Sequence, residues 1–331
     1  FFSPHSSPVG SCNRRSLLRH GLLLAGAYAA SPWLSAGESG VQDEVWNDAS
    51  RSRLVPVLVR WPDVAVKPQG VVIFSHGTGG KRSGADVWGS AWTKAGLVVV
   101  HLQHMGSDAA AVKSLTGFFK ASAPEQLVAR VDDVKFAMDE IQRRHHAGQD
   151  RWGDVPVQQL ALAGHSFGAR TVLAMAGQSF PKAGGWSGLD KRIKAFIALS
   201  PALGRGATAA TAQEDTKAIT RPMLLVSGSM DGEVLNNGET VASRRLVYDV
   251  LPSGAKALLW LENADHMTFA GVEKQIPSNF LVRRDSGTLN AEGLHHRTVA
   301  AVTTAWLKEA LLAQPMASPA GLGSKDLWLR G

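Results

Sequence analysis

The most informative segment of this 331-residue chain is Leu160–Ala169, which reads LALAGHSFGA. Its first four residues are apolar and strand-like, and the residues from Ala169 to Ala176 have helical character. Between them, Gly164-His165-Ser166-Phe167-Gly168 matches the pattern G-x-S-x-G. On a sharp strand-to-helix turn, small flanking residues permit a strained backbone that lifts a serine hydroxyl to the mouth of the sheet. We therefore predict that Ser166 is a nucleophile.

Short apolar runs alternate with amphipathic stretches on both sides of this turn. The apolar runs, which we predict to be strands, are Leu54–Trp61, Gly70–Phe74, Leu97–Leu102, Gln159–Ala163, Ile193–Leu199, Met223–Val226 and Ala257–Leu261. Helical periodicity is found in Asp86–Lys94, from Leu127 to Ile141, in Thr171–Gly177 and in Thr298–Leu312. This alternation favours an α/β fold with a mostly parallel central sheet and helices on both faces.

A serine hydroxyl is a poor nucleophile at neutral pH and needs a base that an acid orients. When the serine lies on such a turn, the acid and then the histidine follow it along the chain, each beyond the carboxyl end of a strand. Asp231 follows the strand Met223–Val226, whereas Ser200-Pro201-Ala202-Leu203, after the preceding strand, contains no carboxylate. We predict that Asp231 is the acid.

The base is predicted in the loop after the last predicted strand. His266 lies just beyond Ala257–Leu261, whereas His295 and His296 are expected to open the final helix. We predict that His266 removes the proton of Ser166 and that the neighbouring Asp265 has a supporting or solvated role.

An oxyanion hole needs two backbone N–H groups that point at one position. We expect one from Phe167, the residue after the nucleophile, which also begins a helix with its positive dipole end. The other is expected from the glycine-rich loop after Gly70–Phe74, where Thr78 is the first choice and Gly79 the second.

Metal and phosphate sites are disfavoured by the same stretches. The loop His76–Gly80 lacks the further glycine and hydroxyl residues of a P-loop or a dinucleotide fingerprint. His101 and His104 are three residues apart on a strand, where they point to opposite faces, and no H-E-x-x-H motif accompanies them. We expect these two histidines to be packed or to line a pocket, and we predict no metal and no cofactor.

The net charge of +7 is a weak indication of nucleic-acid binding, because three arginines of the excess lie in residues 1–36 and no basic run is interleaved with aromatics. The only cysteine is Cys12, so disulfides, iron–sulfur clusters and a cysteine nucleophile are excluded beyond the first 36 residues. We predict no nucleic-acid partner, and the sequence leaves the oligomeric state open.

The N-terminal residues have the pattern of an export signal. Asn13–Arg19, with the pair Arg14-Arg15, precedes an apolar stretch from Gly21 to Ala30 that is too short for an ordinary membrane-spanning helix. Paired arginines at this spacing resemble the twin-arginine signal of bacteria, and an ordinary secretory signal is the alternative. No cysteine follows the apolar run. We therefore expect an exported, periplasmic or secreted protein without a stable membrane anchor.

We therefore expect an export signal in residues 1–36, a catalytic domain in residues 37–313 and a loosely held tail in residues 314–331. Leu327 and Trp328 could dock this tail on the domain. Three loops are expected to form the walls of the substrate pocket, namely Gly106–Ala123, Gly204–Thr220 and Gly271–Asn290. Gly204–Thr220, rich in Ala, Thr and Gly, is a candidate lid.

Four segments resemble predicted dienelactone-hydrolase-like proteins, which are related to the lipoprotein-associated platelet-activating-factor acetylhydrolases. They are Phe74–Gly80, Val98–Asp108, Gly164–Ala169 and Asp265–Gly271, and the resemblance covers most of residues 41–312. It implies the α/β-hydrolase fold, hydrolysis of esters that are often small or short-chain, no metal, and an oxyanion role for Thr78. Dienelactone hydrolases proper use a cysteine nucleophile, whereas this chain has Ser166.

These observations predict a serine hydrolase that forms an acyl-enzyme from short-chain, aryl or polyester-type esters, with small-molecule or polymeric esters as its partners. Phospholipid acyl groups stay open as well. The alternatives are an amidase or thioesterase with the same three residues, and an exported binding protein that keeps the fold without the chemistry. The presence of every expected catalytic element favours the enzyme, because a binding module has no need of a strained serine turn.

A histidine base predicts that activity falls in the acidic range, where the imidazole gains a proton and can no longer accept one from the serine. The measurement is kcat/KM for an ester substrate across the acidic and neutral range. A flat profile between about pH 5 and pH 8 would contradict a role for His266 as the base.

Overall fold

The computed structural model describes residues 40–204, 206–232, 239–254, 256–274, 276 and 284–331. The predicted export signal, with Cys12, lies outside the described residues and stays a prediction, and so does part of the predicted wall Gly271–Asn290. Among the helices of the described residues, none combines the length and the apolar character that crossing a membrane requires.

One mixed sheet contains every strand of the described residues. Its strands are β1 (Val41–Asp48), β2 (Arg53–Arg60), β3 (Gly70–Ser75), β4 (Leu97–Leu102), β5 (Leu160–His165), β6 (Ala195–Leu199), β7 (Met223–Met230), β8 (Lys256–Asp265) and β9 (Leu327–Arg330). They lie in the order β1-β2-β4-β3-β5-β6-β7-β8-β9. Strands β3 to β8 pair in parallel, whereas β1, β2 and β9 pair antiparallel with their neighbours. The predicted mostly parallel sheet is confirmed.

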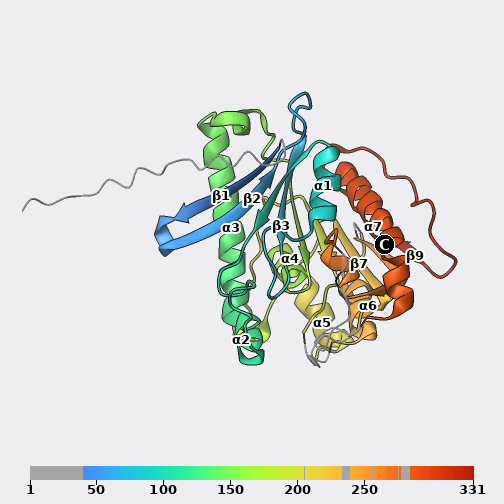
Figure 1. The fold of residues 1–331 in the computed structure, drawn as a ribbon. Coiled ribbons are helices and arrows are strands. Elements are labelled where there is room, and N and C mark those ends of the chain that lie inside the picture. Colours follow the sequence, from blue (N-terminus) through green and yellow to red (C-terminus); the bar gives the residue numbers. More distant parts are fainter. Residues whose placement is uncertain (1–39, 205, 233–238, 255, 275, 277–283) are drawn as a thin grey trace, which may run out of the picture. The chain divides into compact units, whose positions relative to one another are not determined.

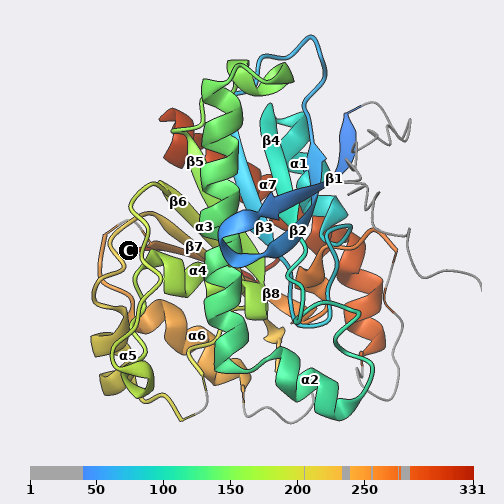
Figure 2. The ribbon, with the colours of Figure 1, turned by 90° about the vertical axis from the view of Figure 1, so that its left-hand side faces the viewer.

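Helices cover both faces of this sheet (Figures 1 and 2). One face packs against α1 (Asp86–Lys94) and α7 (Ser286–Leu312). The other packs against α3 (Pro124–His146), α4 (Phe167–Ala176), α5 (Ala209–Thr216) and α6 (Val241–Val250). The shorter elements are α2 (Leu115–Ala121) and the 3₁₀ turns η1 (Ala49–Arg51), η2 (Asp150–Asp154), η3 (Pro181–Ala183) and η4 (Thr268–Ala270).

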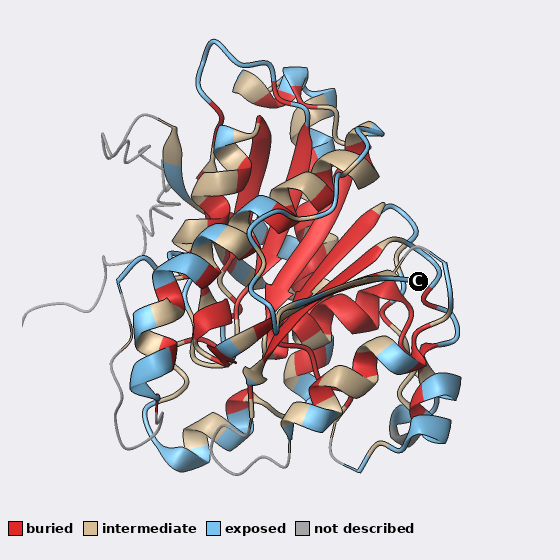
Figure 3. Ribbon diagram, turned by 90° about the vertical axis from the view of Figure 1, so that its right-hand side faces the viewer, coloured by how far each residue is buried: buried red, intermediate tan, exposed pale blue. Residues whose placement is uncertain are grey.

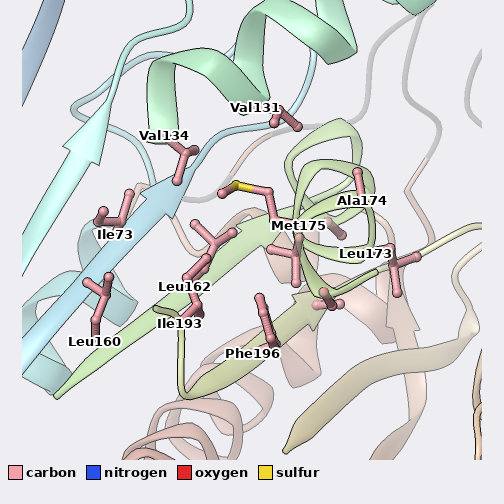
Figure 4. Close-up of a cluster of buried hydrophobic side chains, with 14 of the residues drawn as sticks. Ile73, Val131, Val134, Leu160, Leu162, Leu173, Ala174, Met175, Ile193 and Phe196 are labelled. Atoms are coloured by element: carbon pink, nitrogen blue, oxygen red, sulfur yellow. The ribbon is translucent and has the colours of Figure 1, made fainter. Parts of the chain in front are cut away.

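The strands in the middle of the sheet are buried along their whole length, as Figure 3 shows in red. This burial explains why they are continuous apolar runs without polar alternation, as expected of parallel strands covered on both faces. Figure 4 shows the layer between the sheet and α3 and α4. There Leu162 of β5 lies among Ile73, Met175 and Phe196, and all four side chains are buried.

Two parts of the fold differ from the predictions. The last helix begins at Ser286, not at Thr298, because Asp285 caps its first turn by accepting a hydrogen bond from the N–H of Gly287. His295 and His296 therefore lie inside the helix and do not open it. In addition, strand β1 and helices α2, α5 and α6 are not among the predicted elements.

The segment after residue 314 docks at the two residues that the sequence suggests. Leu327 and Trp328 belong to β9, which pairs with Ala257–Trp260 of β8.

We predict that Leu162→Ala lowers the free energy of unfolding by about 2–5 kcal/mol, because the truncation leaves a cavity that a close-packed layer fills only partly. Urea denaturation checks this value. Leu54→Ala is the matched control, since Leu54 is 53% exposed and its truncation should change the stability by less than about 0.5 kcal/mol. Equal losses for the two variants would contradict the packing described for β5.

Candidate active site

Four neighbouring parallel strands end at the same edge of the sheet, and a polar residue directly follows each of them. These residues are Ser166 after β5, Ser200 after β6, Asp231 after β7 and His266 after β8. Because the carboxyl ends of parallel strands share one edge, residues up to 100 positions apart meet there. The topology therefore brings the three predicted triad residues together, along with one serine for which no role was predicted.

The turn between β5 and α4 has the strained backbone that the sequence predicts. Ser166 has φ 56° and ψ −117°, which is unusual for a residue other than glycine. Glycine is required at Gly168, because a Cβ there would lie 1.9 Å from the carbonyl oxygen of Ser75. A Cβ on Gly164 would lie 2.5 Å from the backbone of Gly168. The two glycines let this turn pack directly on β3, and Ser166 borders a cavity.

The imidazole of His266 lies between the predicted nucleophile and the predicted acid. Its Nε2 is 3.0 Å from Oγ of Ser166, and its Nδ1 is 3.1 Å from Oδ1 of Asp231. The backbone carbonyl of His266 is in turn 3.0 Å from Nε2 of His165, within hydrogen-bonding distance. The three side chains thus have the separations that transfer of the serine proton to Nε2 requires.

Asp231 is fully buried, and four polar side chains surround its carboxylate. Oδ1 lies 2.7 Å from Nε of Arg244 and accepts a hydrogen bond from the hydroxyl of Ser200 at 2.8 Å, and it is the atom that faces His266. Oδ2 accepts a hydrogen bond from Ser227 at 2.8 Å. Burial alone would raise the pKa of Asp231, but the charge of Arg244 and the hydrogen bonds with His266 and Ser227 outweigh it, so the pKa is lowered. The buried carboxylate is therefore ionised at neutral pH.

The glycine-rich loop after β3 lies directly beside the turn that carries Ser166. A Cβ built on Gly77 would be 3.2 Å from the Cβ of Ser166. The N–H of Gly79 donates to the carbonyl of Ser107 at 2.9 Å. No hydrogen bond from the N–H of Thr78 or of Phe167 is found within the described part of the chain. Of the two loop residues considered, Thr78 is thus the one whose N–H is available to a ligand.

Arg130 of α3 links the two segments that carry these N–H groups. Its guanidinium donates to the carbonyl of His76 at 2.5 Å and to that of Gly77 at 3.3 Å. Its Cζ lies 4.6 Å from the centre of the Phe167 ring. Arg130 is fully buried, and burial lowers its pKa to about 9, so the cation persists at neutral pH. Its hydrogen bonds fix the carbonyl groups just before Thr78.

A second Ser-His-Asp arrangement lies beneath the glycine-rich loop, and no substrate can reach it. Nε2 of His104 is 2.8 Å from Oγ of Ser75, and its Nδ1 is 3.0 Å from the carboxylate of Asp133. All three side chains are fully buried, and burial together with the charge of Arg130 lowers the pKa of His104 to about 4. This neutral histidine therefore joins β3 to α3 as a structural hydrogen-bonding residue.

His101 and His104 are packed in the interior, which is one of the two roles predicted for them. Neither lines the cavity beside Ser166, which was the other predicted role. His101 lies under α1, where a Cβ on Gly89 would be 2.5 Å from its Nε2. Within the described residues there is no group of three or more side chains that could hold a metal ion.

The loop that carries His266 is held by a buried arginine. Arg284 donates to both carboxylate oxygens of Asp265, at 2.7 and 3.0 Å, and to Glu292 of α7 at 2.6 Å. Asp265 also accepts hydrogen bonds from the backbone and hydroxyl groups of Thr268, both at 2.8 Å. Asp265 is therefore a buried, paired residue that fixes the end of β8, and it is not a solvated one.

A cavity of about 840 Å³ borders Ser166, His266 and the glycine-rich loop. Its apolar lining includes Val112, Phe118, Phe119, Val272 and Ile276. These residues come from two of the predicted walls, Gly106–Ala123 and the described part of Gly271–Asn290. No described residue of Gly204–Thr220 lines the cavity; instead, its helix α5 packs beside α6.

Several residues around the site were not predicted from the sequence, and three of them are the closest to the proposed chemistry. Ser200 directly follows β6, at a position where a carboxylate would be recognised as the acid, whereas a hydroxyl there has no distinctive pattern. Arg244 lies in α6, a helix that was not predicted. Arg130 did leave a signal, because it is three residues after Leu127 and four before Val134, so the apolar stripe of the predicted helix contains a cation.

We predict that Arg244→Met destabilises the protein by about 3–5 kcal/mol at neutral pH, because it leaves a buried carboxylate without its counter-charge. Asp231 has a lowered pKa in the folded protein, so its stabilising contribution is present above its ordinary value of 3.8 and fades as pH falls through the folded value. In the variant this contribution is lost, so the deficit should shrink as the pH falls. Urea unfolding at several pH values measures both effects.

The neighbouring Arg245→Met is the matched control for that measurement. Arg245 is half-buried and lies 3.4 Å from the exposed carboxylate of Asp249, and such a surface pair contributes about 0–1 kcal/mol. A loss for Arg244→Met that is as small as the loss for Arg245→Met would contradict the counter-charge role of Arg244.

No family model matches the chain, and no curated protein is significantly similar to it. Solved structures do resemble it. A dienelactone hydrolase from Anabaena variabilis has a TM-score of 0.51 at 17% identity, over 82% of this chain and 99% of that one. A cold-adapted esterase from an Arctic intertidal metagenomic library, in complex with PEG, has a TM-score of 0.54 at 15% identity, over 83% and 96%. The 2,6-dihydroxy-pseudo-oxynicotine hydrolase has a TM-score of 0.53 at 13% identity, over 86% and 72%. At these identities the likeness concerns the fold, and this chain has the α/β-hydrolase fold.

Proposed function

We propose that this protein is a serine hydrolase that cleaves carboxylic esters through an acyl-enzyme. The observation that carries the proposal is the position of the His266 ring, with Nε2 at 3.0 Å from Oγ of Ser166 and Nδ1 at 3.1 Å from Asp231. The strained backbone of Ser166 and its place beside a cavity of about 840 Å³ support the same conclusion.

In the proposed first step, Oγ of Ser166 attacks the ester carbonyl carbon while Nε2 of His266 takes the hydroxyl proton. The carbonyl oxygen becomes an oxyanion, which the N–H groups of Thr78 and Phe167 stabilise. The intermediate then collapses, and the alcohol leaves with the proton from His266. Water enters, gives a proton to His266 and attacks the acyl-enzyme, and the acid product is released as Ser166 regains its proton.

Asp231 has an electrostatic and an orienting role in this mechanism. Its lowered pKa keeps it ionised at neutral pH, so it favours the tautomer of His266 with a proton on Nδ1 and stabilises the imidazolium that forms. Arg244 balances the buried charge of Asp231 without contacting the serine.

The lining of the cavity supports an apolar acyl or aryl group on the substrate. Val112, Phe118 and Phe119 lie on one wall, and Val272 and Ile276 lie on another. A cavity of this volume accommodates a small molecule or the end of a polymer chain. We therefore propose short-chain, aryl or polyester-type esters as substrates. The names of two structures with the same fold, a dienelactone hydrolase and an esterase, agree with ester hydrolysis in general.

We expect a fluorophosphonate probe to label the protein covalently, because it reacts with an activated serine, and we expect Ser166→Ala to abolish the labelling. Gel fluorescence after incubation with the probe measures this. Ser253→Ala is the control, since Ser253 is an exposed serine that should not affect the labelling. Labelling that persists in Ser166→Ala would contradict the assignment of the nucleophile.

A panel of p-nitrophenyl esters of increasing acyl length, assayed beside the matching p-nitroanilides, tests the bond that is cleaved. Faster turnover of the esters supports the esterase proposal, and faster turnover of the anilides would replace it with an amidase. Failure to label and to hydrolyse either series would favour a binding protein.

A further inference from the structure

The hydroxyl of Ser200 lies between the proposed acid and the proposed base. Its Oγ is 2.7 Å from Nδ1 of His266 and 2.8 Å from Oδ1 of Asp231. The direct separation of Nδ1 and Oδ1 is longer, at 3.1 Å. Ser200 is therefore the nearer partner of the histidine, and its side chain is fully buried, so solvent does not compete for these contacts.

The protonation states determine which group donates in each contact. The pKa of Asp231 is lowered, so its carboxylate only accepts hydrogen bonds, and the hydroxyl of Ser200 must donate to it. Nε2 of His266 needs a free lone pair to receive the proton of Ser166, so the neutral ring has its proton on Nδ1. That N–H can then donate to a lone pair of Ser200 Oγ. The result is one directed chain from Nδ1–H through the hydroxyl to Oδ1.

The separations around Oδ1 of Asp231 favour this indirect route. Oδ1 accepts the hydrogen bond of the Ser200 hydroxyl at 2.8 Å and lies 2.7 Å from the charged Nε of Arg244, whose N–H donates to the backbone carbonyl of Asp231 at 3.0 Å. Among these groups, Nδ1 of His266 has the longest separation from Oδ1, at 3.1 Å. The oxygen of Ser200, in contrast, is only 2.7 Å from Nδ1 and has a lone pair for its N–H.

The backbone at Ser200 is held in a conformation that favours glycine. Its φ is 53°, in the left-handed region, and a side chain there is retained only where its surroundings enforce it. The N–H donates to the carbonyl of Val226 at 2.7 Å, and the carbonyl accepts from Arg244 at 3.0 Å. Glycine would adopt this conformation without strain. The backbone therefore gives no reason for a serine at this position, and the contacts of the hydroxyl do.

We propose that Ser200 is a positioning residue for catalysis, whose hydroxyl holds the His266 ring and transmits the field of Asp231 to it. This role rests on the proposed function and adds a fourth side chain to it. The hydroxyl keeps its own proton throughout. It accepts the Nδ1–H bond more strongly as the ring becomes an imidazolium, while it continues to donate to Asp231.

The test compares Ser200→Gly with Ser200→Ala. Both variants lack the hydroxyl, but only glycine fits φ 53° without strain, so Ser200→Gly should melt at a higher temperature than Ser200→Ala. We expect both to lose about 10- to 100-fold in kcat, the effect of one hydrogen bond to a charged group, with little change in KM. If the role of Ser200 were only structural, activity would follow stability, and Ser200→Gly would be the more active variant.

Ser227→Ala is the matched control, because it removes the hydrogen bond to the other oxygen of Asp231, which does not face the histidine. Its loss in kcat should be smaller than that of Ser200→Gly. Equal losses for these two variants, or an unchanged kcat in Ser200→Gly, would overturn the proposal.

Proton NMR of the imidazole N–H region decides the question even if no ester is hydrolysed. We expect a downfield Nδ1–H resonance of His266 in the unmodified protein. It should shift or broaden in Ser200→Gly and stay nearly unchanged in Ser227→Ala. A resonance that is identical in the unmodified protein and in Ser200→Gly would refute a contact between Ser200 and His266 and leave the proposed hydrolase activity untouched. If the unmodified protein hydrolyses no ester but its Nδ1–H resonance still shifts in Ser200→Gly, only the proposed function is refuted.

Discussion

The buried negative charge of Asp231 is the constraint on which the geometry of the site depends. Removing a carboxylate from water costs several kcal/mol unless opposite charge and hydrogen bonds compensate for it. Here Arg244, Ser200, Ser227 and His266 provide that compensation. These residues come from α6 and from the ends of different strands. Their contacts with the carboxylate of Asp231 therefore fix the relative positions of several loops. The orientation of the His266 ring is one consequence of that arrangement.

Buried arginines have a comparable role on three sides of the site. Arg130 donates to carbonyl groups of the glycine-rich loop, Arg244 pairs with the acid, and Arg284 holds the end of β8 through Asp265. Each is buried and reaches backbone or carboxylate groups that belong to different segments. A planar guanidinium with five donors is suited to this task, because it can bind several acceptors at fixed angles. The loops are therefore held in place mainly by polar contacts, above a sheet that is held by apolar packing.

The sequence predicted well those features that depend on local pattern and chain order. The turn at Ser166 needs small neighbours, and the order serine, aspartate, histidine follows from the connectivity of a parallel sheet, so these residues could be found in a single sequence. Ser200 could not be found, because a hydroxyl after a strand has no distinctive signature and its importance arises only from the strands on each side of it. Helix α6 was missed for another reason: Arg244 and Arg245 interrupt its apolar pattern, and only the structure shows that one of them is buried.

The four residues of β9 protect the outer edge of β8, the strand that leads to His266. Without them, the backbone N–H and C=O groups of an apolar strand would lie open on that side, and open edges of this kind pair with strands of other molecules. Residues 327–330 thus cover Ala257–Trp260 and leave a strand of four residues as the edge of the sheet, and an edge so short offers little backbone for pairing with another molecule. A chain without them would expose the longer edge of β8, at a place remote from the serine.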